Sequence, residues 1–155
     1  MEENEFRRTY DDVRDLPCVF EKAILNRRCG CGVVERFAIG EREGVRCTTW
    51  TGANNCATLL ALLRSNGRFA LGVAEIPGPL PHAQELKLQA GGLQGLKQVL
   101  QPGADERVED IHALVNAARE REGRLANLPF NRIVQGITAF QGRRRRRSRR
   151  QPPPE

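Results

Sequence analysis

A chain of 155 residues can bury roughly two-thirds of its unfolded surface in one core, so it does not need disulfide bonds to fold. Its longest uninterrupted apolar stretch, Leu59 to Leu63, is far shorter than the roughly 18 residues expected of a membrane-spanning helix. The acidic N-terminus lacks the basic and apolar segments of a secretory signal, so we expect a cytoplasmic protein. In that reducing compartment, clustered cysteines more often bind metal or carry out redox chemistry than form structural disulfides.

The net charge of +6 comes entirely from the C-terminal end of the chain. Seven of the 25 basic residues and only one of the 19 acidic residues follow residue 142, so residues 1–142 hold 18 of each sign. We therefore expect a single neutral globular domain over residues 1–142 and a disordered Arg/Pro-rich tail over residues 143–155. The tail could bind nucleic acid or another polyanion without sequence specificity, or simply aid solubility. Its basic side chains are Arg143, Arg144, Arg145, Arg146, Arg147, Arg149 and Arg150.

Two helices and one undecided segment are predicted in the N-terminal part of the chain. Pro17 suits the first position of a helix, and apolar residues recur at helical spacing from there to about residue 28. Residues 33–46 fit either a short helix or an irregular strand. A second helix is expected to begin near Asn54, a plausible cap, and to end at Gly67.

The middle of the chain predicts a short β-hairpin over about residues 68–90, because apolar residues alternate with small or polar ones on both sides of a proline-rich turn. Helical spacing then returns through residues 92–141, in segments that end at Pro102, run from about Asp105 to Glu122, and open at Pro129. The expected fold class is therefore mostly α (α+β), a small helical domain with a short hairpin in the middle and a cysteine-bearing N-terminal third.

All five cysteines lie within residues 18–56, a denser group than scattered core cysteines would give. Cys18 and Cys56 are both expected in the first turn of a helix, where free main-chain amides and the helix dipole favour a thiolate. Cys31 lies between two glycines, which let the backbone approach a cluster closely. We therefore predict four thiolate ligands, with Cys29 as a spare or alternate ligand. The four are Cys18, Cys31, Cys47 and Cys56.

An iron–sulfur cluster is the favoured cofactor, with [4Fe–4S] ahead of [2Fe–2S]. Structural zinc sites usually use two closely spaced Cys-x-x-Cys or Cys/His pairs, and the sequence contains no Cys-x-x-Cys. Four dispersed thiolates can surround a bulky cubane, whereas one zinc ion must draw all of its sulfurs within about 2.3 Å. Zinc, thiol redox chemistry and purely structural cysteines are the alternatives.

One local pattern resembles a known type of domain. Cys29-Gly30-Cys31, followed by Thr51-Gly52-Ala53 before Cys56, is similar to the [2Fe–2S] domain of bacterioferritin-associated ferredoxins. Those domains pair a Cys-x-Cys with a downstream Cys-x-x-Cys, and the second pair is missing here. The resemblance therefore implies a small helical cluster domain and assigns no family.

The sequence contains no protein-based catalytic motif. It has no phosphate-binding loop with Gly-Lys, no Gly-x-Ser-x-Gly and no His-Glu-x-x-His. His82 and His112 each stand alone, and an exposed or structural role explains them better than catalysis. We expect a small cytoplasmic iron–sulfur protein that acts in electron transfer or redox and iron sensing with a protein redox partner. The alternative is a zinc-stapled binding module whose Arg-rich tail contacts nucleic acid or another polyanion.

Overall fold

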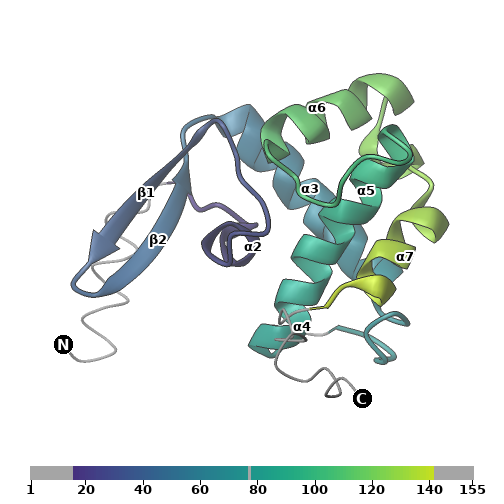
Figure 1. Cartoon of the computed structure of the whole chain (residues 1–155), viewed down its shortest axis with the longest axis horizontal. Helices are drawn as coiled ribbons and strands as arrows, with labels where there is room; N and C mark the ends of the chain where they lie inside the picture. Colours follow the sequence, from purple (N-terminus) through teal and green to yellow (C-terminus); the bar gives the residue numbers. More distant parts are fainter. Residues whose placement is uncertain (1–15, 77, 142–155) are drawn as a thin grey trace, which may run out of the picture.

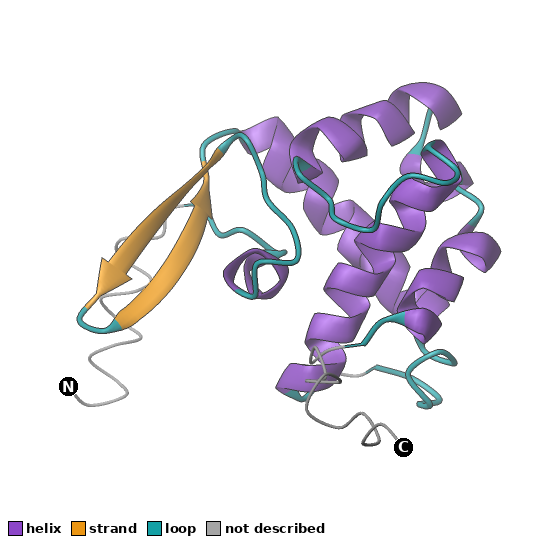
Figure 2. Ribbon diagram, in the orientation of Figure 1, coloured by secondary structure: helices purple, strands orange, loops and turns teal. Residues whose placement is uncertain are grey.

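A β-hairpin stands beside a bundle of helices in the computed structural model, which describes residues 16–76 and 78–141 (Figure 1). The predicted Arg/Pro-rich tail lies outside these residues. The expected class, a mostly helical domain with one small hairpin, is confirmed (Figure 2). In chain order the elements are α2 (Glu21–Leu25), β1 (Val34–Ile39), β2 (Arg42–Cys47), α3 (Trp50–Gly67), α4 (His82–Leu86), the π-helical η1 (Lys87–Gly91), α5 (Gly92–Leu100), α6 (Ile111–Glu122), the 3-10 turn η2 (Leu125–Asn127) and α7 (Phe130–Ala139).

The core of the bundle lies where α3, α5 and α7 meet. Each contributes fully buried aliphatic side chains at helical spacing, because a stripe of such residues on each helix is removed from water by the others. These side chains include Leu59, Leu63, Leu93, Leu96, Ile133 and Ile137. In the described ranges no helix combines the length and the apolar character needed to cross a membrane.

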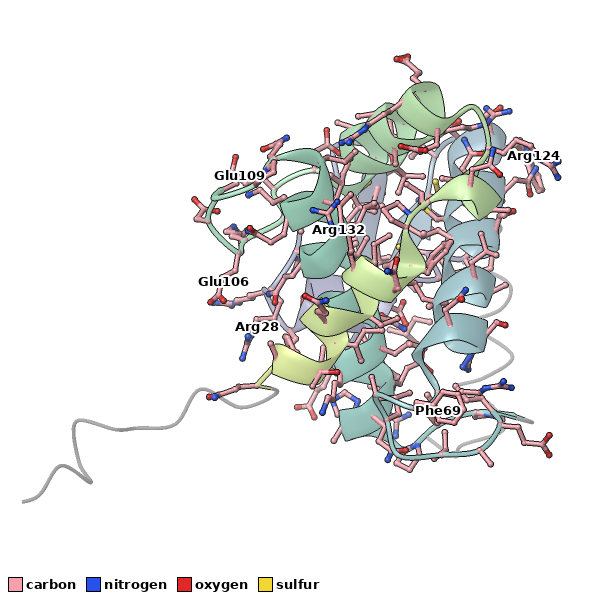
Figure 3. The ribbon with its side chains drawn as sticks, turned by 90° about the vertical axis from the view of Figure 1, so that its right-hand side faces the viewer. Arg28, Phe69, Glu106, Glu109, Arg124 and Arg132 are labelled. Carbon is pink, nitrogen blue, oxygen red and sulfur yellow. The ribbon has the colours of Figure 1, made fainter. Side chains whose placement is uncertain are left out.

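The predicted hairpin over residues 68–90 is wrong in position. The antiparallel pair of strands is β1 and β2, with Val34 opposite Cys47 and Ile39 opposite Arg42, in the stretch that the sequence left undecided. Residues 82–100 instead form one continuous helical rod made of α4, η1 and α5. Phe69, expected on a strand, is 77 % exposed in a loop (Figure 3).

Buried polar groups explain why the alternating pattern was misleading. The alternation of Leu86 and Leu88 with polar neighbours placed Gln89 at a solvent-facing position of a strand, yet Gln89 is buried, and so is Glu85. The Gln89 amide donates to Glu85 (2.8 Å), which also pairs with Arg64 (3.2 Å), and the main-chain N–H of Ala23 donates to the Gln89 side chain (3.2 Å). This network satisfies the buried polar atoms and connects α2 and α3 to the rod.

The two N-terminal helices begin elsewhere than predicted. Pro17 pairs with Arg46 beside β2, so α2 starts only at Glu21, whose carboxylate accepts the main-chain N–H of Val45 (2.7 Å). Helix α3 starts at Trp50, because the Thr49 hydroxyl accepts the N–H of Gly52 (3.4 Å) and caps it. Asn54 is therefore not the cap.

Helices α5 and α7 approach so closely that only glycine fits at their crossing. A Cβ on Gly95 would overlap the main-chain carbonyl of Ile133, and one on Gly91 would lie 2.8 Å from the carbonyl oxygen of Gly136. Backbone atoms cannot give way as the end of a flexible side chain can, so the two helix axes would have to separate.

Gly95→Ala is therefore expected to lower the free energy of unfolding by at least about 1–3 kcal/mol, the usual cost of overpacking a core. Gly78→Ala is the matched control, because its added Cβ would meet no atom within 4 Å. Denaturant unfolding of both variants provides the measurement. Equal stability of the two would contradict the close helix crossing.

Candidate metal centre

Four cysteines line one pocket between the hairpin and the helices. Cys18 comes from the extended segment before α2, Cys31 from the loop after α2, Cys47 from the end of β2, and Cys56 from α3. The remaining lining residues are Pro17, Phe20, Val33, Val34, Gly52, Ala53, Ile111 and His112. These are the four cysteines predicted as ligands, and Cys29 is not among the lining residues.

Neither of the two outer cysteines occupies the first helical turn that the sequence predicted. Cys18 lies in an extended strand-like segment, where its N–H donates to the Val45 carbonyl (3.4 Å) and the Cys47 N–H donates to the Leu16 carbonyl (2.7 Å). Cys56 lies in the second turn of α3, because that helix starts earlier than expected. The pairing of its segment with β2 places Cys18 at the pocket, and the long helix α3 places Cys56 there. Neither thiol depends on a helix start for its position.

The pocket has few polar groups besides the thiols and one imidazole. Its volume is about 20 Å³, which leaves space for roughly one water molecule. No Lys or Arg is among its lining residues in the described ranges. A thiolate formed there would therefore lose much of its hydration without gaining a nearby positive charge from the protein.

The pKa values of the thiols follow from this environment. Burial, together with the smaller effect of the nearby Cys18, Cys31 and Cys47, raises the pKa of Cys56 to about 12. Burial also raises the pKa of Cys18 to about 12, against an opposing hydrogen bond from the Phe20 main-chain N–H. Both thiols are neutral at physiological pH, and a bound cation would be needed to make thiolates of them together.

Main-chain groups orient the other two thiols. Burial raises the pKa of Cys31, while hydrogen bonds from the main-chain N–H groups of Val33 and His112 lower it. The His112 N–H belongs to the first turn of α6, where helical amides lack partners within the helix. The Cys47 thiol donates to the carbonyl oxygen of Thr49 (3.3 Å), the residue that caps α3.

The start of α6 holds the Cys31 loop in place. The Gly30 N–H donates to the Val108 carbonyl and the Ile111 N–H donates to the Gly30 carbonyl, both at 2.8 Å. The Asp110 carboxylate accepts the N–H of Gly32 (3.0 Å) and caps α6 through the N–H of Ala113 (3.4 Å). One carboxylate therefore fixes both the helix start and the loop that carries Cys31.

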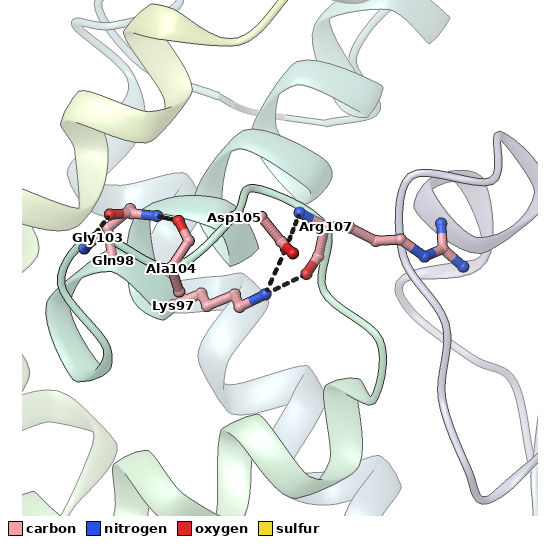
Figure 4. Close-up of polar contacts among 6 residues, drawn as sticks. All are labelled: Lys97, Gln98, Gly103, Ala104, Asp105 and Arg107. Carbon is pink, nitrogen blue, oxygen red and sulfur yellow. Dashed lines mark hydrogen bonds and ion pairs between the residues drawn. The ribbon is translucent and has the colours of Figure 1, made fainter.

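The loop that leads into α6 is itself anchored on α5. Lys97 donates to the Asp105 carboxylate (3.0 Å) and to the main-chain carbonyl of Arg107 (Figure 4). The Arg107 guanidinium then reaches the carbonyl of Arg27 (2.7 Å), at the end of the α2 segment. Glu109, further along this loop, points outward (Figure 3).

Cys29 has a structural environment. Its side chain is 1 % exposed in the hydrophobic core, and its backbone forms a parallel bridge with Val108. Burial raises the pKa of Cys29 to about 12, although Arg107 and Arg28 act in the opposite direction. Cys29 fills the core between α2 and the loop before α6.

Across residues 16–76 and 78–141, no three His, Cys, Asp or Glu side chains are arranged to hold one metal ion. A mononuclear zinc site would need the sulfurs to converge within about 2.3 Å of one point. In a cubane cluster each thiolate binds a different iron, so the sulfurs need to surround a larger body rather than meet at a point. Four thiols around one pocket are a donor set that either cofactor could use, and a pocket with space for roughly one water molecule would have to widen to admit a cubane.

His112 is a pocket residue that the sequence reasoning assigned to a structural role. Its position two residues after the Asp110 cap indicated a helix start, but nothing local connected that start to the cysteines more than 50 residues earlier. His82 is exposed, with Nδ1 lying 3.1 Å from the ammonium nitrogen of Lys22, and it is not among the residues that line the pocket.

No protein-family model, curated protein or solved structure matches this chain. The functional interpretation therefore depends on the chemistry of the four thiols and their surroundings.

Asp110→Ala is expected to lower the free energy of unfolding by about 1–2 kcal/mol, since it removes a helix cap and leaves the N–H of Gly32 without its acceptor. Glu109→Ala, at the exposed neighbouring position, is the control and should change stability by less than about 0.5 kcal/mol. Chemical denaturation monitored by circular dichroism compares the two. A control variant as unstable as Asp110→Ala would contradict the role assigned to Asp110.

Proposed function

We propose that the protein binds an iron–sulfur cluster through Cys18, Cys31, Cys47 and Cys56 and acts in electron transfer or in redox or iron sensing. The observation that carries this proposal is the meeting of four thiols from four separate segments at one pocket, with the fifth cysteine elsewhere. Core cysteines that serve only to fill space are not expected to gather four at one pocket with the fifth elsewhere.

Electrostatics supports a cationic cofactor. Neighbouring thiolates repel one another in a poorly hydrated pocket, so the thiols stay protonated in the absence of a counter-charge. Iron ions supply that charge, and their binding displaces the thiol protons. Main-chain N–H groups already directed at Cys18 and Cys31 are the kind of donors that tune such clusters.

A [4Fe–4S] cluster fits the distribution of ligands better than a [2Fe–2S] cluster. Each iron of a [2Fe–2S] cluster takes two thiolates, which favours closely paired cysteines. Each of the four pocket cysteines instead comes from a different segment. In the one Cys-x-Cys pair of the sequence, Cys31 lines the pocket and Cys29 is buried in the core.

Zinc is the second candidate, because four thiols are also a suitable zinc donor set. It would require the sulfurs to converge on one point, which the described side chains do not do. Thiol redox catalysis is less well supported, since a nucleophilic cysteine needs a lowered pKa and burial raises those of Cys18, Cys31 and Cys56.

The cytoplasmic location, a protein redox partner and polyanion binding by the Arg-rich tail belong to the same proposal. Iron–thiolate chemistry is compatible with a reducing compartment. The tail would add salt-sensitive attraction to phosphates, separable from the cluster because the rest of the chain is neutral.

Single replacements of the pocket cysteines by serine are expected to remove most of the bound iron and sulfide and to lower stability, because metal-binding free energy is also folding free energy. Cys29→Ala is the control, since it removes a thiol from the core and none from the pocket. It should lose stability through the small cavity it creates and keep the cluster.

The measurement is iron, zinc and acid-labile sulfide per chain, with the visible spectrum, for anaerobically purified variants. Equal metal retention in all five single variants would contradict the four-ligand assignment. One zinc per chain without sulfide would select the second candidate.

A further inference from the structure

Among the residues that line the cysteine pocket in the described ranges, His112 is the only one whose side chain contains nitrogen, in its imidazole ring. Its Nδ1 edge faces α3, where a Cβ added to Gly52 would lie 3.0 Å from Nδ1 and 3.2 Å from Cε1. The main-chain N–H of the same residue reaches Cys31. Both the main chain and the imidazole ring of His112 therefore lie at the pocket, the main chain beside Cys31 and the ring beside Gly52.

Asn116 fixes the far side of the ring. Its Nδ2 lies 3.1 Å from His112 Nε2, one turn along α6. With the Asn116 amide in this orientation its nitrogen donates, Nε2 accepts, and the ring proton is on Nδ1. Nδ1 has no hydrogen-bond partner within residues 16–76 and 78–141. In this tautomer the imidazole brings an unused N–H donor to the pocket wall.

We propose that His112 Nδ1–H donates a hydrogen bond to the sulfur-rich cofactor held by the four cysteines and raises its reduction potential, with Asn116 setting the tautomer. This inference rests on the proposed function. One electron supplied by an external reductant adds one negative charge to the cofactor, and no bond at His112 forms or breaks. A donor stabilises the more negative state more strongly, so it favours reduction.

Gly52 makes this approach of the ring possible. A side chain at that position would collide with the imidazole and with the methyl group of Thr49, 2.7 Å from the added Cβ. Gly52 is buried in the first turn of α3, and it also lines the pocket. The absence of its side chain leaves the Nδ1 edge against the pocket wall.

The test is the midpoint potential of the cluster-loaded full chain, measured by dye-mediated reductive titration with dithionite. His112→Phe should keep the iron and sulfide content and shift the oxidised-to-reduced equilibrium about tenfold toward the oxidised form, about 59 mV for one electron. His112→Gln, whose amide can also donate, should restore part of the shift. His82→Phe, at an exposed position outside the pocket lining, should have no effect.

Nitrogen-15 NMR of the protein before cluster loading provides a second measurement that does not depend on the His112 variants folding. It should show the Nδ1–H tautomer for His112, and the Nε2–H tautomer would overturn the inference. An unchanged potential in a fully loaded His112→Phe variant would also overturn it. A wild-type protein without iron and sulfide would overturn the proposed function itself, and this inference with it.

Discussion

Repulsion among buried thiolates is the constraint on which the site depends. Four thiols share one small pocket, and each ionised neighbour makes ionisation of the next more costly, in addition to the loss of hydration. Without a metal, burial raises the pKa values of Cys18 and Cys56 to about 12, so these thiols stay protonated and do not repel one another. The proposed cofactor would remove this repulsion, since it would replace four protons with metal–sulfur bonds. The same arrangement that makes the thiols poor nucleophiles makes them suitable ligands.

The helical bundle matters to this site because it holds the elements that deliver the thiols. Cys56 lies on the long helix α3, but the segment that carries Cys18, Cys31 and Cys47 contains only α2 and the hairpin as regular structure. This segment is attached to the bundle at a few points: the Gln89 network under α2, the Asp110 carboxylate at Gly32, and the reach of Arg107 to Arg27. The Lys97 contacts that fix the loop before α6 therefore support Cys31 indirectly, through a rigid helix rather than through the pocket.

The sequence predicted the fold class and the helices that end before Pro102 and begin after Pro129, because helical periodicity there coincides with clear stop and start signals. The helix predicted from about Asp105 begins only at Ile111, because the Asp110 side chain caps it there. The sequence failed where tertiary contacts override local pattern. Buried Gln89 imitated the polar face of a strand, and Pro17 joined β2 instead of starting a helix. The glycines around Cys31 were expected to let the backbone approach a cluster, and in the structure they lie against the Glu109 carbonyl and the Asp110 carboxylate at the start of α6. His112 was missed because its proximity to Cys31 exists only after α6 packs against the loop.

We propose that thiolates from four separate segments hold a multi-iron cofactor rather than a single ion. Native mass spectrometry of the full chain, purified without oxygen, tests this directly because it weighs the intact protein with whatever it binds. We expect a species heavier than the bare chain by four irons and four sulfides, less the protons released by four thiols. A species heavier by one zinc, or one with no added mass under conditions that preserve the fold, would contradict the account.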